Sequence, residues 1–539
     1  MEKYINTASD LITGRAIPSA TVSVYRAGTG LLATLYEDDG ITTKGNPVTA
    51  DANAEYSFSA INGRYDIVVA KTGYQSHTMT NVELYDTEQA SDYGMISSST
   101  DNTGALQAAI DAIEARVATG NSNGAVIEIP PGTHTFLGSV SINNSFIRLI
   151  GAGTQSTLLH FANGALDCFV IDGATATGGN LRDVCISDLT ISGNGLKSAG
   201  ASVKISNAFR CLIERVSIDN GITGIDIGGN TNTITLRDTL INVNQGSSLY
   251  GIYWHCPGDG SLRSDALTVE SVIVEANWSN ADCFVWEGFC NSLSGSGLRL
   301  LHGRYGMRVL NTAASASYYP AFCNLHDAEF EGAKNRALDI RGGNEIKITN
   351  FDINNLSGSA SQGNADDYAI YIDSDLSHSV TRGVQLSNGR IGLCRSNAIY
   401  SDSMDLQMEN VICSSASYAG VNNAAAVRLG SSSSDVQIAN LIAEEFGGTA
   451  RCSYAVQIDS GAARIQGANV NATYCNTGHI LNNSAGQVCF YNVINISGNL
   501  VPYVGVLFQN YANDAAAAAG GIAIGGMYRN GSIQMQRVA

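Results

Sequence analysis

A short phrase recurs through the middle of the chain, first as Gly251-Ile252-Tyr253-Trp254-His255 and about thirty residues later as Cys283-Phe284-Val285-Trp286-Glu287. In each copy, apolar residues alternate with residues that point the other way, which is the period of a strand with one buried face. A further copy precedes these two, at 224–228, and the phrase returns after them at similar intervals, at 306–310, 337–341, 369–373, 398–402, 426–430 and 455–459. A strand repeat of fixed period predicts a stacked array of coils.

A second strand phrase accompanies the first and predicts another column of the array, at 216–219, 272–275, 298–301, 328–331, 351–354, 411–414 and 441–444. Stacked coils lie about 4.8 Å apart, so equivalent residues of successive coils are direct neighbours. The outward residues of this column then form two files. One file reads Ile273, Arg299, Glu329 and Asp352, and the other reads Glu275, Leu301, Glu331 and Asn354.

The segment ahead of the repeat has a different pattern. Asn102 and Thr103 cap a helix predicted over 104–118, whose apolar face consists of Leu106, Ala109, Ile110 and Ile113. A strand over 125–129 then leads into Pro130-Pro131-Gly132-Thr133, and Gly151-Ala152-Gly153-Thr154-Gln155-Ser156-Thr157 follows.

These segments resemble the start of the pectate-lyase-like right-handed parallel β-helix of phage tailspikes and polysaccharide depolymerases. The resemblance covers roughly residues 90–490. It implies an all-β fold, namely a single-stranded parallel β-helix with a small N-terminal β-sandwich and a short C-terminal cap. It also implies a homotrimer.

The chain is expected to have four parts. Residues 1–90 alternate in short segments separated by turns, and they resemble the transthyretin-like or carboxypeptidase-regulatory-like sandwich, which implies a virion-attachment domain. Residues 91–164 hold the linker, the capping helix and the first coils. Residues 165–495 form the β-helix with the glycan-binding and catalytic region, and 496–539 form a C-terminal cap or trimerisation segment.

Composition limits the function. A formal net charge of -18 argues against nucleic acid and anionic lipid as partners, because both require a basic surface. The chain has 12 cysteines without a C-x-x-C pair, and they are predicted to be reduced core residues. The first residues show no signal peptide, and no apolar run reaches membrane-spanning length.

The first set of candidate catalytic residues lies on the second phrase. Glu329 and Asp352 are predicted to lie about 5 Å apart, so that one of their pKa values rises, as a general acid requires. Glu275 and Glu331 fall two coils apart, roughly 10 Å, near the upper end expected for an inverting glycosidase. Arg299 flanks Glu329. A solvated polar face with an Arg–Glu pair is the alternative interpretation.

The first phrase and the turns beside it supply the remaining candidates. Glu287, Asp327 and Asp339 are alternative catalytic acids. Substrate-binding candidates, besides Arg299, are Trp278, Tyr253, His255, Arg308 and Arg341. Trp254 and Trp286 occupy the inward phase and are predicted to be core, so only Trp278 is a candidate sugar-stacking platform.

Several specific signals are missing. The Asn-Thr-Asp, Asp-Asp and Gly-His-Gly motifs of polygalacturonases have no match in the right context, and Gly478-His479-Ile480 is only a partial echo. The calcium-binding acids and catalytic Arg of pectate lyases are not matched. No zinc-type His spacing or phosphate-binding loop is present. The sequence therefore predicts neither a metal nor a cofactor.

The leading hypothesis is a phage tailspike, made in the host cytoplasm and located in the virion tail, that cleaves a bacterial surface polysaccharide with paired carboxylates. Its expected partners are capsule, exopolysaccharide or O-antigen, a tail or baseplate protein bound through the N-terminal domain, and two further copies of the chain. A polysaccharide lyase acting by β-elimination on a uronic acid is one alternative, with Tyr253, His255, Arg308 and Arg341 as its parts. A receptor-binding spike without catalysis is the other.

Overall fold

The computed structural model describes most of the chain, in the ranges 2–10, 13–37, 42–61, 63–84, 87–118, 124–175, 179–193, 198–257, 261–276, 280–311, 319–354, 368–373, 381–392, 397–414, 424–444, 452–504, 513, 515–516, 527–530 and 533–536. It divides into two compact units. The first comprises 1–162, 169–190 and 208–216, and the second comprises 163–168, 191–207 and 217–539. Trp278 and Cys394 lie outside the described residues.

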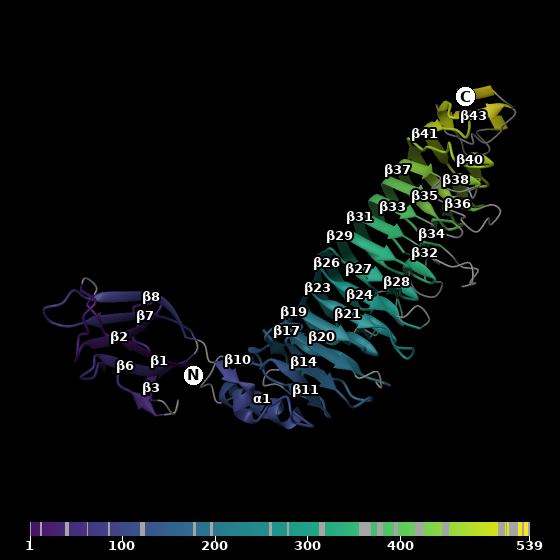
Figure 1. The fold of residues 1–539 in the computed structure, drawn as a ribbon. Coiled ribbons are helices and arrows are strands. Elements are labelled where there is room, and N and C mark those ends of the chain that lie inside the picture. The colour runs from purple at the N-terminus through teal and green to yellow at the C-terminus, as the bar shows by residue number, and fades with distance from the viewer. Residues whose placement is uncertain are drawn as a thin grey trace. The chain divides into compact units, whose positions relative to one another are not determined.

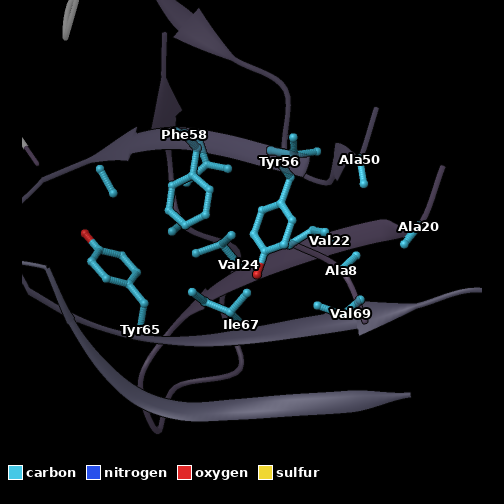
Figure 2. Packing of buried hydrophobic residues seen from close by; sticks show 14 of the residues in the cluster. Ala8, Ala20, Val22, Val24, Ala50, Tyr56, Phe58, Tyr65, Ile67 and Val69 are labelled. Carbon is cyan, nitrogen blue, oxygen red and sulfur yellow. The ribbon is translucent and has the colours of Figure 1, made fainter. Parts of the chain in front are cut away.

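The first unit begins with two four-stranded antiparallel sheets. One sheet has the order β1 (Glu2–Thr7), β6 (Glu55–Ala60), β3 (Leu35–Tyr36) and β4 (Thr43–Lys44). The other has the order β5 (Val48–Thr49), β2 (Thr21–Arg26), β7 (Gly63–Ala70) and β8 (His77–Leu84). Alternating residues of both sheets share one core, in which Figure 2 shows Val22 and Val24 of β2 opposite Tyr56 and Phe58 of β6.

The predicted helix is confirmed. After β9 (Thr87–Gln89) and the short helix η1 (Ala90–Tyr93), helix α1 spans Thr103–Ala118. The Asp101 carboxylate accepts the first free backbone N–H, that of Thr103, at 2.9 Å. The predicted apolar face is fully buried, and consists of Leu106, Ala109, Ile110 and Ile113.

The first parallel coils follow α1, and they belong to the same unit over 125–162, 169–190 and 208–216. Strands β10 (Ala125–Glu128), β11 (Gly132–Phe136) and β12 (Val140–Ile142) pair in parallel with β13 (Ile147–Ile150), β14 (Thr157–Phe161) and β15 (Phe169–Asp172). The short helix η2 (Gly173–Thr175) comes next, and then β16 (Leu181–Arg182), β17 (Cys185–Gly193), β18 (Ala201–Phe209) and β19 (Leu212–Asp219). Phe136 stacks on Phe161 at 4.8 Å between ring centroids, so one coil supports the next.

The second unit consists of coils whose strands form three parallel sheets, and these strands follow one another in sequence order along the stack in Figure 1. The first sheet holds β20 (Thr223–Arg237, first half), β22 (Tyr250–Cys256), β25 (Asp282–Gly288), β28 (Tyr305–Leu310), β30 (Arg336–Arg341), β32 (Ile370–Asp373), β34 (Ile399–Asp402), β36 (Ala425–Leu429), β38 (Tyr454–Ile458) and β40 (Gly478–Asn482).

Five long strands contribute to both of the other sheets: β29 (Ala321–Glu331), β31 (Asn344–Asn354), β33 (Gln385–Gly392), β35 (Gln407–Ser414) and β37 (Ser434–Glu444). Their second halves join β21 (Leu240–Val243), β24 (Ile273–Ala276) and β27 (Arg299–Leu301) in the second sheet. Their first halves join the second half of β20, β23 (Ser264–Glu270), β26 (Cys290–Ser296), β39 (Ala463–Ala468) and β41 (Val488–Ile494) in the third sheet.

Each long strand bends at a residue with positive φ: Asp327, Asn350, Asn388, Asn410 and Asn440. Asn and Asp tolerate this left-handed conformation better than other residues with a side chain. Their side chains also bond from coil to coil, since the Asn440 amide donates to Asn410 at 2.7 Å and the Asn410 amide donates to Asn388 at 2.8 Å. These hydrogen bonds between coils thus hold successive strands at the same bend.

The interior confirms the predicted phase of the repeat. Trp254 and Trp286 are 1% and 0% exposed and stack at 5.4 Å. Their indole N–H groups donate to Ser264 Oγ and to the Cys290 carbonyl oxygen, so neither buried donor is left unsatisfied. All eleven cysteines of the described residues are free, and ten are buried, as predicted.

Parallel stacking ends at β41, which pairs with β39 on one side and antiparallel with β42 (Leu500–Val504) on the other. A separate antiparallel hairpin, β43 (Met527–Asn530) with β44 (Ile533–Gln536), follows. Across the described residues, no helix combines the length and the apolar character that crossing a bilayer requires.

Candidate functional site

The register of the second sheet places the predicted acids as neighbours. Ile273, Arg299, Glu329 and Asp352 pair in succession, as do Glu275, Leu301, Glu331 and Asn354. The next strand adds Arg390 beside Asp352. We call the outward surface formed by Glu275, Arg299, Glu329, Glu331, Asp352, Asn354 and Arg390 the acid face.

Glu329 is held by an arginine. Arg299 Nε lies 2.5 Å from Glu329 Oε2, and Arg299 Nη2 donates to Oε1 at 3.3 Å. Both side chains remain partly exposed, at 44% and 32%. Two charge-assisted bonds in a fork geometry fix the position of the Glu329 carboxylate. Glu329 is thereby held next to Asp352 in the register.

Asp352 is the acid of this face whose pKa is raised. Burial is the main cause, the Glu329 carboxylate raises the pKa further, and the Arg390 guanidinium opposes the shift. Asn354 Nδ2 donates to Asp352 Oδ2 at 2.9 Å, while the buried Oδ1 has no hydrogen-bond partner among the described residues. The sequence predicted that one carboxyl of this pair would have a raised pKa, and the structure assigns the shift to Asp352.

Glu331 and Glu275 complete the acid face. Glu331 is half-buried, and its carboxylate has no hydrogen bond or ion pair to any described residue. Glu275 Oε1 lies 3.5 Å from His302 Nδ1. Glu331 pairs with Asn354, two residues beyond Asp352. Strand rise and strand spacing then put the Cα atoms of Glu331 and Asp352 about 8 Å apart.

Asp327 lies outside the acid face. It is the left-handed residue at which β29 bends, and its side chain is 59% exposed. His326 and the Asn350 amide both hydrogen-bond its carboxylate and lower its pKa. A lowered pKa is the opposite of what a general acid needs near neutral pH.

The first sheet presents a second cluster, dominated by two fully buried carboxylates. Asp282 receives a bidentate pair from Arg304 at 2.8 Å and a further bond from Arg308 at 3.1 Å. Asp339 is bound by Arg336 at 2.8 Å and by Arg341 at 3.1 Å, with Arg308 Nε at 3.5 Å. Both aspartates are 0% exposed. Such density of arginines offsets the cost of burying the two charges.

Aromatic rings lie beside this cluster. Tyr253 stacks on Tyr250 at 4.5 Å and on His255 at 4.1 Å. His255 Nε2 lies 2.8 Å from Asp226 Oδ1, and the Tyr253 hydroxyl donates to Glu287 at 3.0 Å. Burial and the Glu287 carboxylate raise the pKa of Tyr253, so its hydroxyl stays protonated. We call Tyr250, Tyr253, His255 and Glu287 the tyrosine–histidine ladder.

The structure thus sorts the predicted residues into separate groups. Glu275, Arg299, Glu329 and Glu331 share the acid face, whereas Tyr253, His255 and Glu287 form the ladder and Arg308, Asp339 and Arg341 form the arginine cluster. Arg304, Arg336 and Asp282 were not among the predicted site residues, because they lie in turns or at strand starts rather than in the outward files. Within the described residues no group of three or more potential ligands is arranged to hold a metal.

Comparison with known proteins gives the fold. No family model and no curated protein matches the chain. The N-terminal fragment of bacteriophage phi29 gene product 12 shares 14% identity at a TM-score of 0.50, over 77% of this chain and 73% of that one. The A-module of a mannuronan C-5 epimerase from Azotobacter vinelandii shares 17% identity at a TM-score of 0.47, over 75% of this chain and 98% of that one.

A family 28 exopolygalacturonase from Yersinia enterocolitica shares 10% identity at a TM-score of 0.47, over 90% of this chain and 99% of that one. The strand pairing and the likeness to the phage fragment confirm the predicted fold, a single-stranded parallel β-helix.

Proposed function

We propose that this chain is a phage tailspike protein that binds a bacterial surface polysaccharide and cleaves it as an endo-glycoside hydrolase. The observation that carries the proposal is the acid face itself, where the register places Glu329, Glu331 and Asp352 on neighbouring strands and Arg299 binds Glu329. Burial and the nearby carboxylates raise the pKa of Asp352, and a carboxyl with a raised pKa near further carboxylates is the arrangement that glycoside hydrolysis uses. The β-helix shared with a bacteriophage gene product is consistent with it.

In this mechanism Asp352 is the general acid. It donates its proton to the glycosidic oxygen as the bond from that oxygen to the anomeric carbon breaks. Glu331 takes a proton from the water that attacks the anomeric carbon. Glu331 has no ion pair with any described residue and so can accept this proton, whereas both oxygens of Glu329 already accept hydrogen bonds from Arg299. The Glu329 carboxylate instead adds to the rise in the pKa of Asp352 that burial causes.

The spacing of the two backbone positions bears on the stereochemistry. The Cα atoms of Asp352 and Glu331 lie about 8 Å apart, which allows their carboxyl groups the roughly 6.5–9.5 Å separation of inverting enzymes. The alternative pair, Glu329 with Asp352 one coil away, would suit a retaining enzyme at about 5 Å. Because Glu329 is bound by Arg299, we favour inversion. Proton NMR of the first product anomer separates the two mechanisms.

The direct test uses a panel of purified capsular polysaccharides and lipopolysaccharides. Size-exclusion chromatography after incubation should show shorter fragments and new reducing ends from one polymer. Asp352→Asn should bind that polymer and leave it intact. Retained binding with no cleavage by the unchanged protein would identify a receptor-binding spike instead of an enzyme.

A lyase remains the second candidate because of the tyrosine–histidine ladder. His255 has one ring nitrogen on Asp226, which orients the imidazole, and the protonated Tyr253 hydroxyl beside it could donate to a leaving oxygen. On a uronic acid this pair would abstract the proton at C5 and expel the 4-linked sugar. Fragments carrying the ultraviolet absorbance of an unsaturated uronate would select this candidate.

We further propose that the N-terminal antiparallel sheets attach the protein to a phage tail or baseplate protein, and that the chain forms a homotrimer in the virion. A small, separate core of its own suits the first role. Size-exclusion chromatography with light scattering tests the trimer. Pull-down of the host phage's tail proteins by residues 1–90, and its loss on deleting them from the full chain, tests attachment.

A further inference from the structure

An exposed phenylalanine stands in an unusual place on the third sheet. Phe322, near the start of β29, is 51% exposed and has φ 63°. A bulky residue in this left-handed region is a genuine outlier and costs free energy. The fold needs a left-handed residue at this point of each coil, but it does not need an aromatic one.

The neighbouring coils make this clear. The residues at the same point are Ala266, Ser292, Glu345 and Gly383, and all of them have positive φ. Ser292 lies directly beside Phe322 in the register, and Glu345 lies on its other side. The small Ser292 and Ala266 leave one side of the phenylalanine ring uncovered, so the ring borders a hollow in the sheet surface.

That hollow is a cavity of about 490 Å³. Its walls include Phe322 and the polar side chains Ser294, Asn324, Lys347 and Gln385. The volume lies within the roughly 300–1,000 Å³ of small-ligand sites, which combine apolar surface with a few polar groups. Hydroxyl, amide and charged groups around one aromatic ring match a sugar, whose C–H face packs on the ring while its hydroxyl groups bond to the rim.

A subunit interface fits this surface less well. A stable interface buries about 800 Å² on each partner and gathers several aromatic or aliphatic residues at its centre. Among the described residues, Phe322 is the single aromatic one that lines the cavity, and the outward file beyond Gln385 continues as Gln407, Gln437 and Gln466. Glu345 and Lys347 contribute one charge of each sign, so the cavity has no net preference for an anionic ligand.

We infer that the Phe322 cavity is a second glycan-binding site, which holds a neutral segment of the polymer on the third sheet while the acid face cleaves. The inference rests on the proposed polysaccharide as ligand. Strand β29 carries both Phe322 and Glu329, so the two sites belong to the same coil on different sheets. Two sites on one polymer raise retention of long chains far more than that of short fragments.

The test compares variants that cannot cleave. Asp352→Asn and Asp352→Asn/Phe322→Ala are run by affinity electrophoresis through gels containing the polymer identified from the panel of capsular polysaccharides and lipopolysaccharides. The double variant should bind the long polymer about three- to tenfold more weakly. In the cleaving protein, Phe322→Ala should leave kcat on short oligosaccharide fragments unchanged.

Phe146→Ala is the matched control, since Phe146 is another partly exposed phenylalanine with positive φ (68°). This substitution should change neither the retention of the long polymer nor kcat on short fragments. Equal retention of the single and double variants would overturn this inference alone. Absence of retention already in Asp352→Asn would overturn both proposals. Loss of the oligomer in Phe322→Ala, seen by light scattering, would assign the phenylalanine to a subunit contact and overturn the glycan site.

Discussion

Two carboxylate clusters of the second unit contain the same residue types, acids and arginines, but suit different roles. On the first sheet, Asp282 and Asp339 are fully buried, and two or three arginines bind each of them. On the acid face, Glu329 has one arginine, while Asp352 is half-buried with a raised pKa. Carboxylates that two or three arginines bind are fixed in place and serve as a scaffold. An acid held beside another acid can keep a proton and transfer it.

The largest expected effect tests this division directly. Asp352→Asn removes the transferable proton and should lower kcat by about 10²–10⁴-fold, the usual contribution of a general acid. The fold should survive, because Asn keeps the shape of the side chain and its bond to Asn354. The measurement is the rate of reducing-end release on the cleaved polymer, with circular dichroism to check folding. Activity close to that of the unchanged protein would remove Asp352 from the mechanism.

A substitution in the buried cluster around Asp339 should instead lower the stability of the fold. Asp339→Ala leaves Arg336, whose side chain is 6% exposed, without its carboxylate, and should destabilise the chain by about 3–5 kcal/mol. The effect is measured as a lower midpoint of urea unfolding. Asp435→Asn is the control, since it removes the charge of an exposed pair with Arg464 and keeps a residue that tolerates the left-handed conformation of this position. If both variants unfolded at the same urea concentration, the buried cluster would not be a scaffold.

Much of this contrast could be predicted from the sequence, because strand period and coil spacing together determine the register. Every predicted neighbour pair of the outward file from Arg299 through Asp352 is confirmed. The register cannot say which long side chains reach which acid. Arg304 precedes its strand and Arg336 begins the next one, yet both turn toward buried aspartates. Which aspartate such an arginine side chain contacts depends on the geometry of the turns, and the strand repeat does not determine that geometry.

A smaller effect concerns the pH dependence of cleavage. General-acid activity requires protonated Asp352, so activity falls as the pH rises through its raised pKa. Glu329→Gln removes a charge that raises this pKa and should move the alkaline limb to lower pH. Arg390→Gln removes a charge that lowers it and should move the limb to higher pH.

The two variants therefore serve as controls for each other, since they change neighbouring charges of opposite sign on the same acid. The profile of kcat/KM against pH reports the group in the free enzyme. If the alkaline limbs of the two variants shifted in the same direction, or did not shift, the limb would report a group other than Asp352.

The smallest effect is expected at Asp327, which bends β29 and lies outside both clusters. Hydrogen bonds from His326 and Asn350 lower its pKa, so its contribution to stability is present above the ordinary pKa of an aspartate and is lost as the pH falls through the lowered value. Asp327→Asn keeps a residue that tolerates the left-handed bend and extends the asparagine stack. At neutral pH the variant should melt within about 2 °C of the unchanged protein and cleave at the same rate. A loss of cleavage as large as that of Asp352→Asn would move the chemistry from the acid face to the bend of the strand.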